Sequence, residues 1–341
     1  MNKGVKSSKP INIVSSPIYK LPSSNVKYIK NAFITGTGLV CDRKGFIKEC
    51  CHYEWNGQSE LGYTEVIADY CDTEDNPENL LMFDDKETYL IVHNRWHVNY
   101  FHWLNEAIYR LWLVKYKTHT MVLLLPSKEQ LSKIAFDSLK VFNFKDIVYI
   151  PEGKSVQVKT LCLPVQKPIM ESYNPLALAD IRRMYVNYAS SKSIAADQRI
   201  YISRKNSSRR KVANEDEVLD IMTRYNFNVV YCENYTFFEQ VELFSHANFL
   251  ISNHGAGLTN MLFMPQGSTI LELVKRKTNP VRHQSQLYCY MADALGHKYT
   301  HQICEPTDDF EMFFTADILV DINILKANLD LLFTDKSYKY E

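Results

Sequence analysis

The sequence lacks the patterns that mark several classes of protein. Its eight cysteines include no C-x-x-C pair, and several lie in apolar, strand-like runs. They therefore predict free thiols in a reducing compartment, not a zinc site or a disulfide framework. No apolar run approaches the length of a transmembrane helix, and residues 1–16 include no apolar signal region. We therefore expect a cytoplasmic protein, with peripheral association with the inner face of the cell membrane left open.

Neither sign of charge is in excess, because 39 basic side chains balance 39 acidic ones. A neutral chain lacks the overall basic character that attracts nucleic acids and anionic membranes, so we expect no nucleic-acid partner. No D-x-D metal motif occurs at a credible site, since Asp84–Asp85 and Asp308–Asp309 are typical of loops. The sequence therefore predicts no metal site.

The length of 341 residues is long for one hydrophobic core and predicts two domains. Strands and helices alternate along most of the chain, which is typical of an α/β fold. The best candidate linker is the segment 168–175. We expect an N-terminal α/β domain with β-rich additions at residues 1–170 and a C-terminal Rossmann-like domain at residues 171–341.

In the first half, hydrophobic patterning predicts a β-rich start followed by regular α/β alternation. Before residue 88 we expect short strands at 26–29 and 38–42, a hairpin turn at 42–45 and an acidic surface loop at 69–87. Later strands are expected at 88–92, 121–125, 147–150 and 156–164, with helices after the first of them and at 128–141.

In the second half, the same patterning predicts helices at 177–193 and 237–245 and strands at 199–203 and 227–232. Asn214 with Glu217 three residues later resembles a capping box and predicts a helix start. This β-loop-α succession predicts a doubly wound sheet, which binds ligands outside the carboxyl ends of its strands.

The segment 245–274, SHANFLISNHGAGLTNMLFMPQGSTILELV, reads as strand, glycine turn, helix and strand, with the helix expected from Leu258 to Met264. Glycines let the backbone turn sharply and approach a ligand, and a helix start presents unpaired N–H groups to an anion. The simpler interpretation is a tight turn. A separate, basic feature favours the anion site. Arg204 directly follows the strand 199–203 and opens the basic loop 204–211. An arginine side chain can bind phosphate oxygens through two of its nitrogens.

The helix expected after the strand 88–92 carries a polar pair on one face. Asn99 is a plausible N-cap, and His102 and Glu106 lie one turn apart, opposite an apolar face. Aromatic residues crowd this pair, which favours a functional site, while a solvated polar face stays the alternative. The apolar face is expected to consist of Leu104, Ala107, Ile108 and Leu111.

Three strings within residues 199–299 resemble glycosyltransferase family 61, which includes plant xylosyltransferases and the extracellular O-linked N-acetylglucosamine transferase. They are YISRKNSSRRKVANEDEV, FEQVELFSHANFLISNHGAGLTNMLFMPQGSTILEL and CYMADALGHKY. The resemblance extends back to NYFHWLNEAIYRL at residues 99–111. The chain is most similar to bacterial members.

The resemblance implies a GT-B-like fold, in which two Rossmann-like domains face a cleft and the C-terminal one holds most of the donor nucleotide. It implies an inverting transfer of a sugar from a nucleotide sugar, by default a UDP-sugar, to a glycan. An oligosaccharide or lipid-linked acceptor in capsule or other surface polysaccharide assembly is expected. The nucleotide sugar is a substrate, and no cofactor is expected to be required.

The family's N-terminal motif, Asn-x-x-His-x-x-x-acid, matches Asn99, His102 and Glu106. A single displacement needs one base to take the proton of the acceptor hydroxyl. The resemblance implies that Glu106 is this base, with His102 either positioning it or serving in its place.

On the nucleotide side, the resemblance implies that Arg204 holds the diphosphate, assisted by Arg209 or Arg210. Glu272, near the end of a strand, would accept hydrogen bonds from the ribose hydroxyls, and His254 would contact a phosphate or simply pack. The backbone amides of the glycine turn are expected to bind the same diphosphate: Gly255, Ala256 and Gly257.

Two other functions stay open. The first is a non-catalytic module of the same fold that binds a nucleotide sugar or a glycan. The second is a different phosphate-ester enzyme, such as a kinase, which would need Mg²⁺ and a lysine or aspartate set that the sequence does not offer. The complete N-terminal motif favours the transferase over the binding module.

Overall fold

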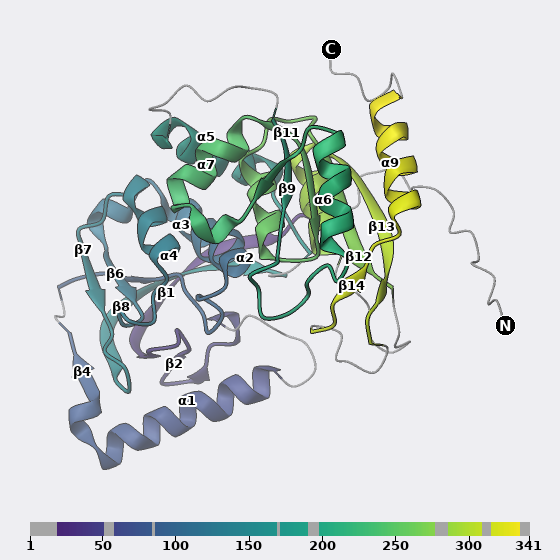
Figure 1. Ribbon diagram of the computed structural model, residues 1–341. Coiled ribbons are helices and arrows are strands. Elements are labelled where there is room, and N and C mark those ends of the chain that lie inside the picture. Colours follow the sequence, from purple (N-terminus) through teal and green to yellow (C-terminus); the bar gives the residue numbers. More distant parts are fainter. Residues whose placement is uncertain are drawn as a thin grey trace. The chain divides into compact units, whose positions relative to one another are not determined.

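The computed structural model describes residues 19–50, 58–83, 86–168, 171–189, 198–276, 286–308 and 315–334, and only the backbone of residues 58–61. They form two compact units, each built on its own sheet (Figure 1). The N-terminal unit comprises residues 20–189 and 236–238, and the C-terminal unit comprises Tyr19 and the other described residues. A mixed α/β fold with two sheets is therefore confirmed.

The division falls after Ala189, whereas the sequence places a boundary at residue 170. Helix α5 (Pro175–Ala189) belongs to the N-terminal unit because its side chains are bonded there. Its Asp180 accepts a 2.6 Å hydrogen bond from Lys115 Nζ. Backbone bonds also anchor the described part of the segment 168–175, since the Tyr173 N–H donates to the Lys20 carbonyl at 2.8 Å. The described part of this segment therefore belongs to the N-terminal unit.

The N-terminal unit contains an eight-stranded mixed sheet of order β3-β2-β1-β8-β5-β6-β7, with β4 also paired to β8. Strands β5, β6 and β7 are parallel, as expected for strands joined by helical crossovers, and a long antiparallel pair of β1 with β8 extends the sheet. The strands are β1 (Ser23–Thr35), β2 (Val40–Asp42), β3 (Gly45–Phe46), β4 (Leu80–Met82), β5 (Tyr89–Ile91), β6 (Val122–Leu125), β7 (Asp146–Tyr149) and β8 (Ser155–Lys167).

The expected loop at 69–87 is wrong, because helix α1 (Gln58–Asp75) covers its first part, followed by η2 (Pro77–Asn79) and β4. Residues 84–85 of this loop lie outside the described residues. The helix has little apolar periodicity because it buries only a narrow stripe, including Val66 and Thr73. The hairpin turn at 42–45 is confirmed, since Asp42 pairs with Gly45. The other helical segments of this unit are η1 (Lys48–Cys50), α2 (Tyr100–His102), η3 (Trp103–Ala107), α3 (Ile108–Val114), η4 (Thr118–Thr120), α4 (Lys133–Ser138) and η5 (Leu139–Val141).

The C-terminal unit contains a six-stranded sheet of order β10-β9-β11-β12-β13-β14, and its first five strands are parallel. In chain order these five strands run 2-1-3-4-5, so the predicted doubly wound sheet is present. The strands are β9 (Gln198–Ile202), β10 (Asn228–Val230), β11 (Ala247–Asn253), β12 (Thr269–Lys275), β13 (Lys298–Pro306) and β14 (Ile318–Leu319).

Helices α6 and α9 lie beside this sheet (Figure 1). Their apolar side chains form a buried cluster with side chains of the strands. Helix α6 starts where the Asn214 pattern predicts, but the capping hydrogen bond is absent. The Asn214 side chain is instead paired with the backbone of Val320 through two 2.9 Å bonds. The helical segments here are α6 (Glu215–Arg224), η6 (Cys232–Asn234), α7 (Phe237–Ser245), η7 (Ala256–Phe263), α8 (Leu287–Leu295) and α9 (Ile322–Thr334).

The cysteines of the described residues are free thiols, as predicted, and Cys51 lies outside these residues. Burial raises the pKa of the half-buried Cys232 thiol to about 12, so this group stays a neutral thiol at neutral pH. None of the helices in the described parts of the chain has both the length and the apolar character needed to span a bilayer.

Candidate active site

Two loops of the C-terminal unit meet at the point where its strand order reverses. Strands β9 and β11 are neighbours, but the chain continues from β9 to β10 on one side and from β11 to β12 on the other. In doubly wound sheets, ligands bind at this switch point, outside the carboxyl ends of the strands. The basic loop after β9 and the glycine turn after β11 therefore lie where the fold places a ligand.

Arg204 lies directly over the glycine turn. A β-carbon at position 255 would lie 2.5 Å from Arg204 Nη1 and 3.1 Å from its Cζ, so the close approach of the guanidinium requires glycine there. The guanidinium is held by donation from Nε to the Arg210 carbonyl and from Nη2 to the Arg209 carbonyl, both at 3.2 Å. The predicted meeting of Arg204 with the glycine turn is confirmed.

The loop is held in a strained conformation at Arg210, whose φ of 56° lies in the left-handed region. This region costs a non-glycine residue roughly 1–2 kcal/mol. The Arg210 carbonyl accepts hydrogen bonds from Arg204 Nε and from Asn253 Nδ2, which fix the conformation. Strain that surrounding bonds maintain is common at ligand sites.

The electrostatics of this cluster favour an anion. Burial lowers the pKa of Arg204, and burial together with the charge of Arg204 lowers the pKa of Arg210 to about 10. No carboxylate of the described residues forms an ion pair with either guanidinium, and Arg210 Nε is buried without a hydrogen-bond partner among them. A bound anion would relieve the repulsion and offset the desolvation of both cations.

The helix start adds further donors. The 3₁₀ helix η7 begins at Ala256, two residues earlier than predicted, and no described side chain caps its first N–H groups. The amides of the glycine turn, Gly255 to Gly257, therefore lie at a positive helix end beside Arg204. The Arg209 side chain is exposed, and only its carbonyl takes part in holding this cluster.

His254 is fixed by two neighbouring strands. Its Nδ1 lies 2.5 Å from Glu272 Oε1 on β12, and the Tyr299 hydroxyl on β13 donates to Glu272 Oε2 at 2.5 Å. The Glu272 side chain is 3% exposed. The Glu272 carboxylate is thus buried and engaged at both oxygens. Glu272 orients the His254 ring.

The N-terminal unit holds the second group of predicted residues. Asn99 caps the helix that follows β5, accepting a 2.9 Å bond from the Phe101 N–H, as predicted. The helix then widens into the π-helical segment η3 and returns to α-helix in α3. The predicted apolar face is buried. Single π-helical turns are rare and occur frequently at functional sites.

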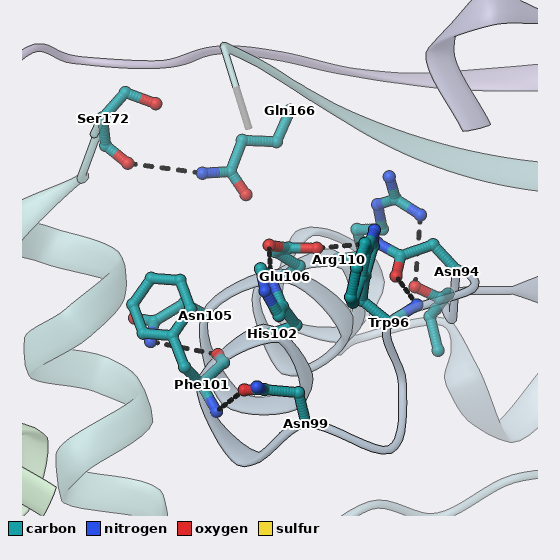
Figure 2. Close-up of polar contacts among 11 residues, drawn as sticks. Asn94, Trp96, Asn99, Phe101, His102, Asn105, Glu106, Arg110, Gln166 and Ser172 are labelled. Atoms are coloured by element: carbon teal, nitrogen blue, oxygen red, sulfur yellow. Dashed lines mark hydrogen bonds and ion pairs between the residues drawn. The ribbon is translucent and has the colours of Figure 1, made fainter. Parts of the chain in front are cut away.

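Glu106 lies within η3 and is clamped between two side chains (Figure 2). Its Oε1 lies 2.6 Å from His102 Nδ1, and its Oε2 accepts a 2.6 Å bond from Asn94 Nδ2. The Glu106 side chain is 1% exposed, whereas that of His102 is 11% exposed. The carboxylate therefore fixes the imidazole with its proton on Nδ1, and Nε2 is the ring atom that can accept a proton.

Two further histidines near this turn are buried as neutral groups. Burial and the neighbouring His97 lower the pKa of His93 to about 3, and burial lowers the pKa of His97. His102 differs from both because its side chain is paired with a carboxylate and lies beside the exposed ring of Trp96, 5.7 Å between centroids. Of these three histidines, His102 is the one whose ring is paired with a carboxylate.

The sequence analysis did not identify two hydrogen-bond partners of the site carboxylates. Asn94 and Tyr299 complete the two carboxylate–histidine pairs, but nothing in their spacing links them to Glu106 or Glu272, because the fold brings them together. In the described ranges, no group of three or more histidine, cysteine, aspartate or glutamate side chains is arranged to hold a metal ion.

Comparisons with known proteins match these two groups of residues. The model of the family Glycosyltransferase 61 matches residues 100–271, which include His102, Glu106, Arg204 and the glycine turn. The chain belongs to glycosyltransferase family 61. The match covers half of the chain and runs from one unit into the other.

Individual relatives match over shorter stretches. Protein O-linked-mannose beta-1,4-N-acetylglucosaminyltransferase 2 of Mus musculus is 38% identical over 74 residues, 21% of this chain and 13% of the relative. EGF domain-specific O-linked N-acetylglucosamine transferase of Drosophila melanogaster is 29% identical over 161 residues, 41% of this chain and 29% of the relative. The chain thus spans less than a third of each of these relatives.

Proposed function

We propose that this family 61 chain is an inverting glycosyltransferase that moves a sugar from a nucleotide sugar to a glycan hydroxyl. The observation that carries the proposal is the cation cluster at the switch point of the C-terminal sheet. There Arg204 and Arg210 lie beside a helix start without a carboxylate partner among the described residues. A nucleoside diphosphate supplies the missing negative charge.

The diphosphate is also the leaving group, so the same cations stabilise the charge that builds on it in the transition state. Arg204, Arg210 and the amides of Gly255 to Gly257 are proposed to serve in this way. No metal is needed in this scheme because guanidinium groups and a helix start supply the positive charge. Both named relatives are transferases of N-acetylglucosamine, so UDP-N-acetylglucosamine is the first donor to test.

His102 is proposed as the general base. It takes the proton of the acceptor hydroxyl on Nε2 while that oxygen attacks the anomeric carbon and the bond to the diphosphate breaks. Glu106 orients the ring and stabilises the imidazolium that forms, and Asn94 positions Glu106. This assignment chooses His102 over Glu106 because the carboxylate is buried and engaged at both oxygens.

The acceptor is proposed to be a glycan, either an oligosaccharide or a lipid-linked chain of surface polysaccharide assembly on the cytoplasmic side of the membrane. The exposed indole of Trp96 beside His102 supports a sugar acceptor, because an aromatic face gives the apolar side of a sugar ring a surface to pack on. A GT-B arrangement of the two units is part of the same proposal.

The binding half of this proposal is tested by thermal unfolding with UDP, GDP, CDP and CMP, each with and without EDTA. A ligand that binds only the native state stabilises it by mass action and so raises the midpoint temperature. At a ligand concentration a hundred times its Kd, the native state is stabilised by about 2.7 kcal/mol. We expect one diphosphate to raise the midpoint, with EDTA making no difference. A midpoint that no nucleotide changes contradicts the donor site, and a shift that EDTA removes contradicts metal independence.

A further inference from the structure

We propose that an exposed patch of the N-terminal unit docks the protein on the surface of a bilayer that contains anionic lipids. The patch is formed by the end of α3, the turn that follows it and the start of α5, all of which belong to this unit. It is separate from the proposed donor site, which belongs to the C-terminal unit. We call it the α3–α5 patch, and it consists of Lys115, Tyr116, Lys117, Leu176, Asp180 and Arg183.

Asp180 joins the two helices within the patch. Its Oδ2 accepts hydrogen bonds from Lys115 Nζ at 2.6 Å and from Trp112 Nε1 of α3 at 3.2 Å. Its Oδ1 accepts a hydrogen bond from Arg183 Nη2 on the next turn of α5. Because one carboxylate bonds side chains from both segments, the patch is one continuous surface.

Two large side chains of the patch are almost fully open to solvent. Tyr116 is 82% exposed and Leu176 is 77% exposed. Both lie on backbone that hydrogen bonds hold in place. The Lys117 N–H donates to the Val114 carbonyl at 2.8 Å, and the Leu176 N–H donates to Asn174 Oδ1 at 3.0 Å. The exposure of these two side chains is therefore a property of ordered turns.

The spacing along α5 places its contribution on one face of the helix. Leu176, Asp180 and Arg183 lie at positions i, i+4 and i+7, which form one stripe of a helix. The residues that α5 buries belong to other positions and include Ala177, Leu178, Ile181 and Tyr185. The helix therefore packs through one stripe and leaves the stripe of the patch outside.

Lys115 holds two aromatic rings at this surface. Its Nζ lies 5.0 Å from the centre of the Tyr116 ring and 5.1 Å from that of the Trp112 ring, within the range of cation–π attraction. Tryptophan and tyrosine are enriched where proteins meet the membrane–water interface, because one part of each ring system is apolar and another part is polar. The pair therefore has the composition of an interfacial anchor.

The patch carries an excess of positive charge. Its cations are Lys115, Lys117 and Arg183, and its one carboxylate, Asp180, is already bonded to two of them. The Arg183 side chain is 68% exposed, and Lys117 is also exposed. Exposed lysine and arginine side chains attract the headgroups of anionic lipids. The charge of the patch therefore complements an anionic bilayer.

The same charge argues against a second copy of the chain as the partner. A two-fold axis through the patch would bring identical surfaces together, so that the positive groups of one copy would face those of the other. A bilayer surface accepts the apolar groups Tyr116 and Leu176 and the cations at once. We therefore assign the patch to a membrane surface.

The test is flotation of the purified protein with vesicles of phosphatidylcholine alone and of phosphatidylcholine mixed with phosphatidylglycerol. We expect binding to the mixed vesicles that weakens as salt is raised, because salt screens the attraction. Tyr116→Ser combined with Leu176→Ser should weaken this binding about tenfold or more, because apolar surface is lost. Lys117→Gln combined with Arg183→Gln should weaken it to a similar extent, since each cation contributes about fivefold.

Met82→Ser combined with Leu331→Ser is the matched control, because both side chains are exposed and lie outside the patch. This variant should bind the mixed vesicles as the wild type does. The inference is wrong if the wild type floats with neither kind of vesicle, if both kinds bind it equally, or if the patch variants bind like the wild type. A dimer in gel filtration that the patch variants dissociate would also overturn it, in favour of a second copy.

The outcome is distinguishable from failure of the proposed function. The patch variants leave the cation cluster of the C-terminal unit unchanged, so they should keep any change in thermal midpoint that nucleotides produce in the wild type. Their thermal midpoints without ligand should also match that of the wild type, because the replaced side chains are exposed. A variant that unfolds at a lower temperature would show that the patch serves the fold and not a membrane.

Discussion

Replacement of His102 by alanine is expected to lower sugar transfer by about a hundredfold to ten-thousandfold, the range that removal of a general base produces. The affinity for nucleoside diphosphate should stay near that of the wild type, because His102 belongs to the N-terminal unit and the cation cluster belongs to the C-terminal unit. Initial rates at saturating donor, together with a titration of UDP, separate the two effects.

Added imidazole provides a further test of this assignment. A small cavity in place of the ring should admit free imidazole and recover part of the activity of His102→Ala, whereas Glu106→Gln should not respond. Replacement of the exposed His119 by glutamine is the control and should leave the rate unchanged. Full activity of His102→Ala would falsify the role of His102 and return the question to Glu106.

Replacement of Arg204 by alanine is expected to weaken binding of UDP about tenfold to a hundredfold and to leave binding of uridine unchanged. A hydrogen bond to a charged group contributes roughly 1.5–3 kcal/mol, and only the diphosphate carries the charge that Arg204 meets. Titration calorimetry with both ligands at one ionic strength measures the difference. Equal losses for UDP and uridine would show that Arg204 acts on the fold and not on the phosphates.

Gly255→Ala should reproduce the Arg204 result without removing the arginine. The added methyl group would lie 2.5 Å from Arg204 Nη1, the mobile end of a long side chain, so the guanidinium should move while the unit stays folded. Arg224→Ala is the control, because this exposed arginine ends helix α6, away from the carboxyl ends of the strands. An unchanged UDP affinity in Gly255→Ala would mean that the position of Arg204 is unimportant.

The sequence predicted the second sheet well, because each parallel strand is a short apolar run followed by a turn and a helix. Strands 199–203 and 227–232 and helix 237–245 agree with β9, β10 and α7 to within two residues. The order 2-1-3-4-5 could not be predicted, since it depends on pairing between distant strands. In that order the carboxyl ends of β9 and β11 are adjacent. The basic loop after β9 and the glycine turn after β11 therefore lie together and form one candidate site.

The candidate catalytic turn was predicted in part. The i, i+4 spacing was enough to bring His102 and Glu106 into contact at 2.6 Å. Local patterning could not reveal the π-helical turn, which adds one residue to a helical turn, or Asn94, which reaches Glu106 from the loop after β5. The burial of Glu106 depends on these tertiary contacts, and it is the reason why we propose His102 and not Glu106 as the base.

The acidic segment before residue 88 was predicted wrongly for a similar physical reason. A helix that buries only a narrow stripe shows weak periodicity, so charge and Pro77 dominated the interpretation, and α1 was missed.

The central claim is a single displacement at the anomeric carbon of a nucleotide sugar. Proton NMR tests it most directly, because the anomeric signals show whether the released sugar has the configuration of the donor or the inverted one. Water can replace the acceptor, so the purified chain is incubated with donor alone. The donors are UDP-N-acetylglucosamine and the sugar donors of whichever nucleotide stabilises the protein. The anomeric configuration of the first sugar released is recorded before that sugar mutarotates. The account predicts slow, EDTA-resistant release of a sugar with inverted anomeric configuration, abolished in His102→Ala. Release with retained configuration, or no consumption of any donor whose nucleotide binds, would contradict it.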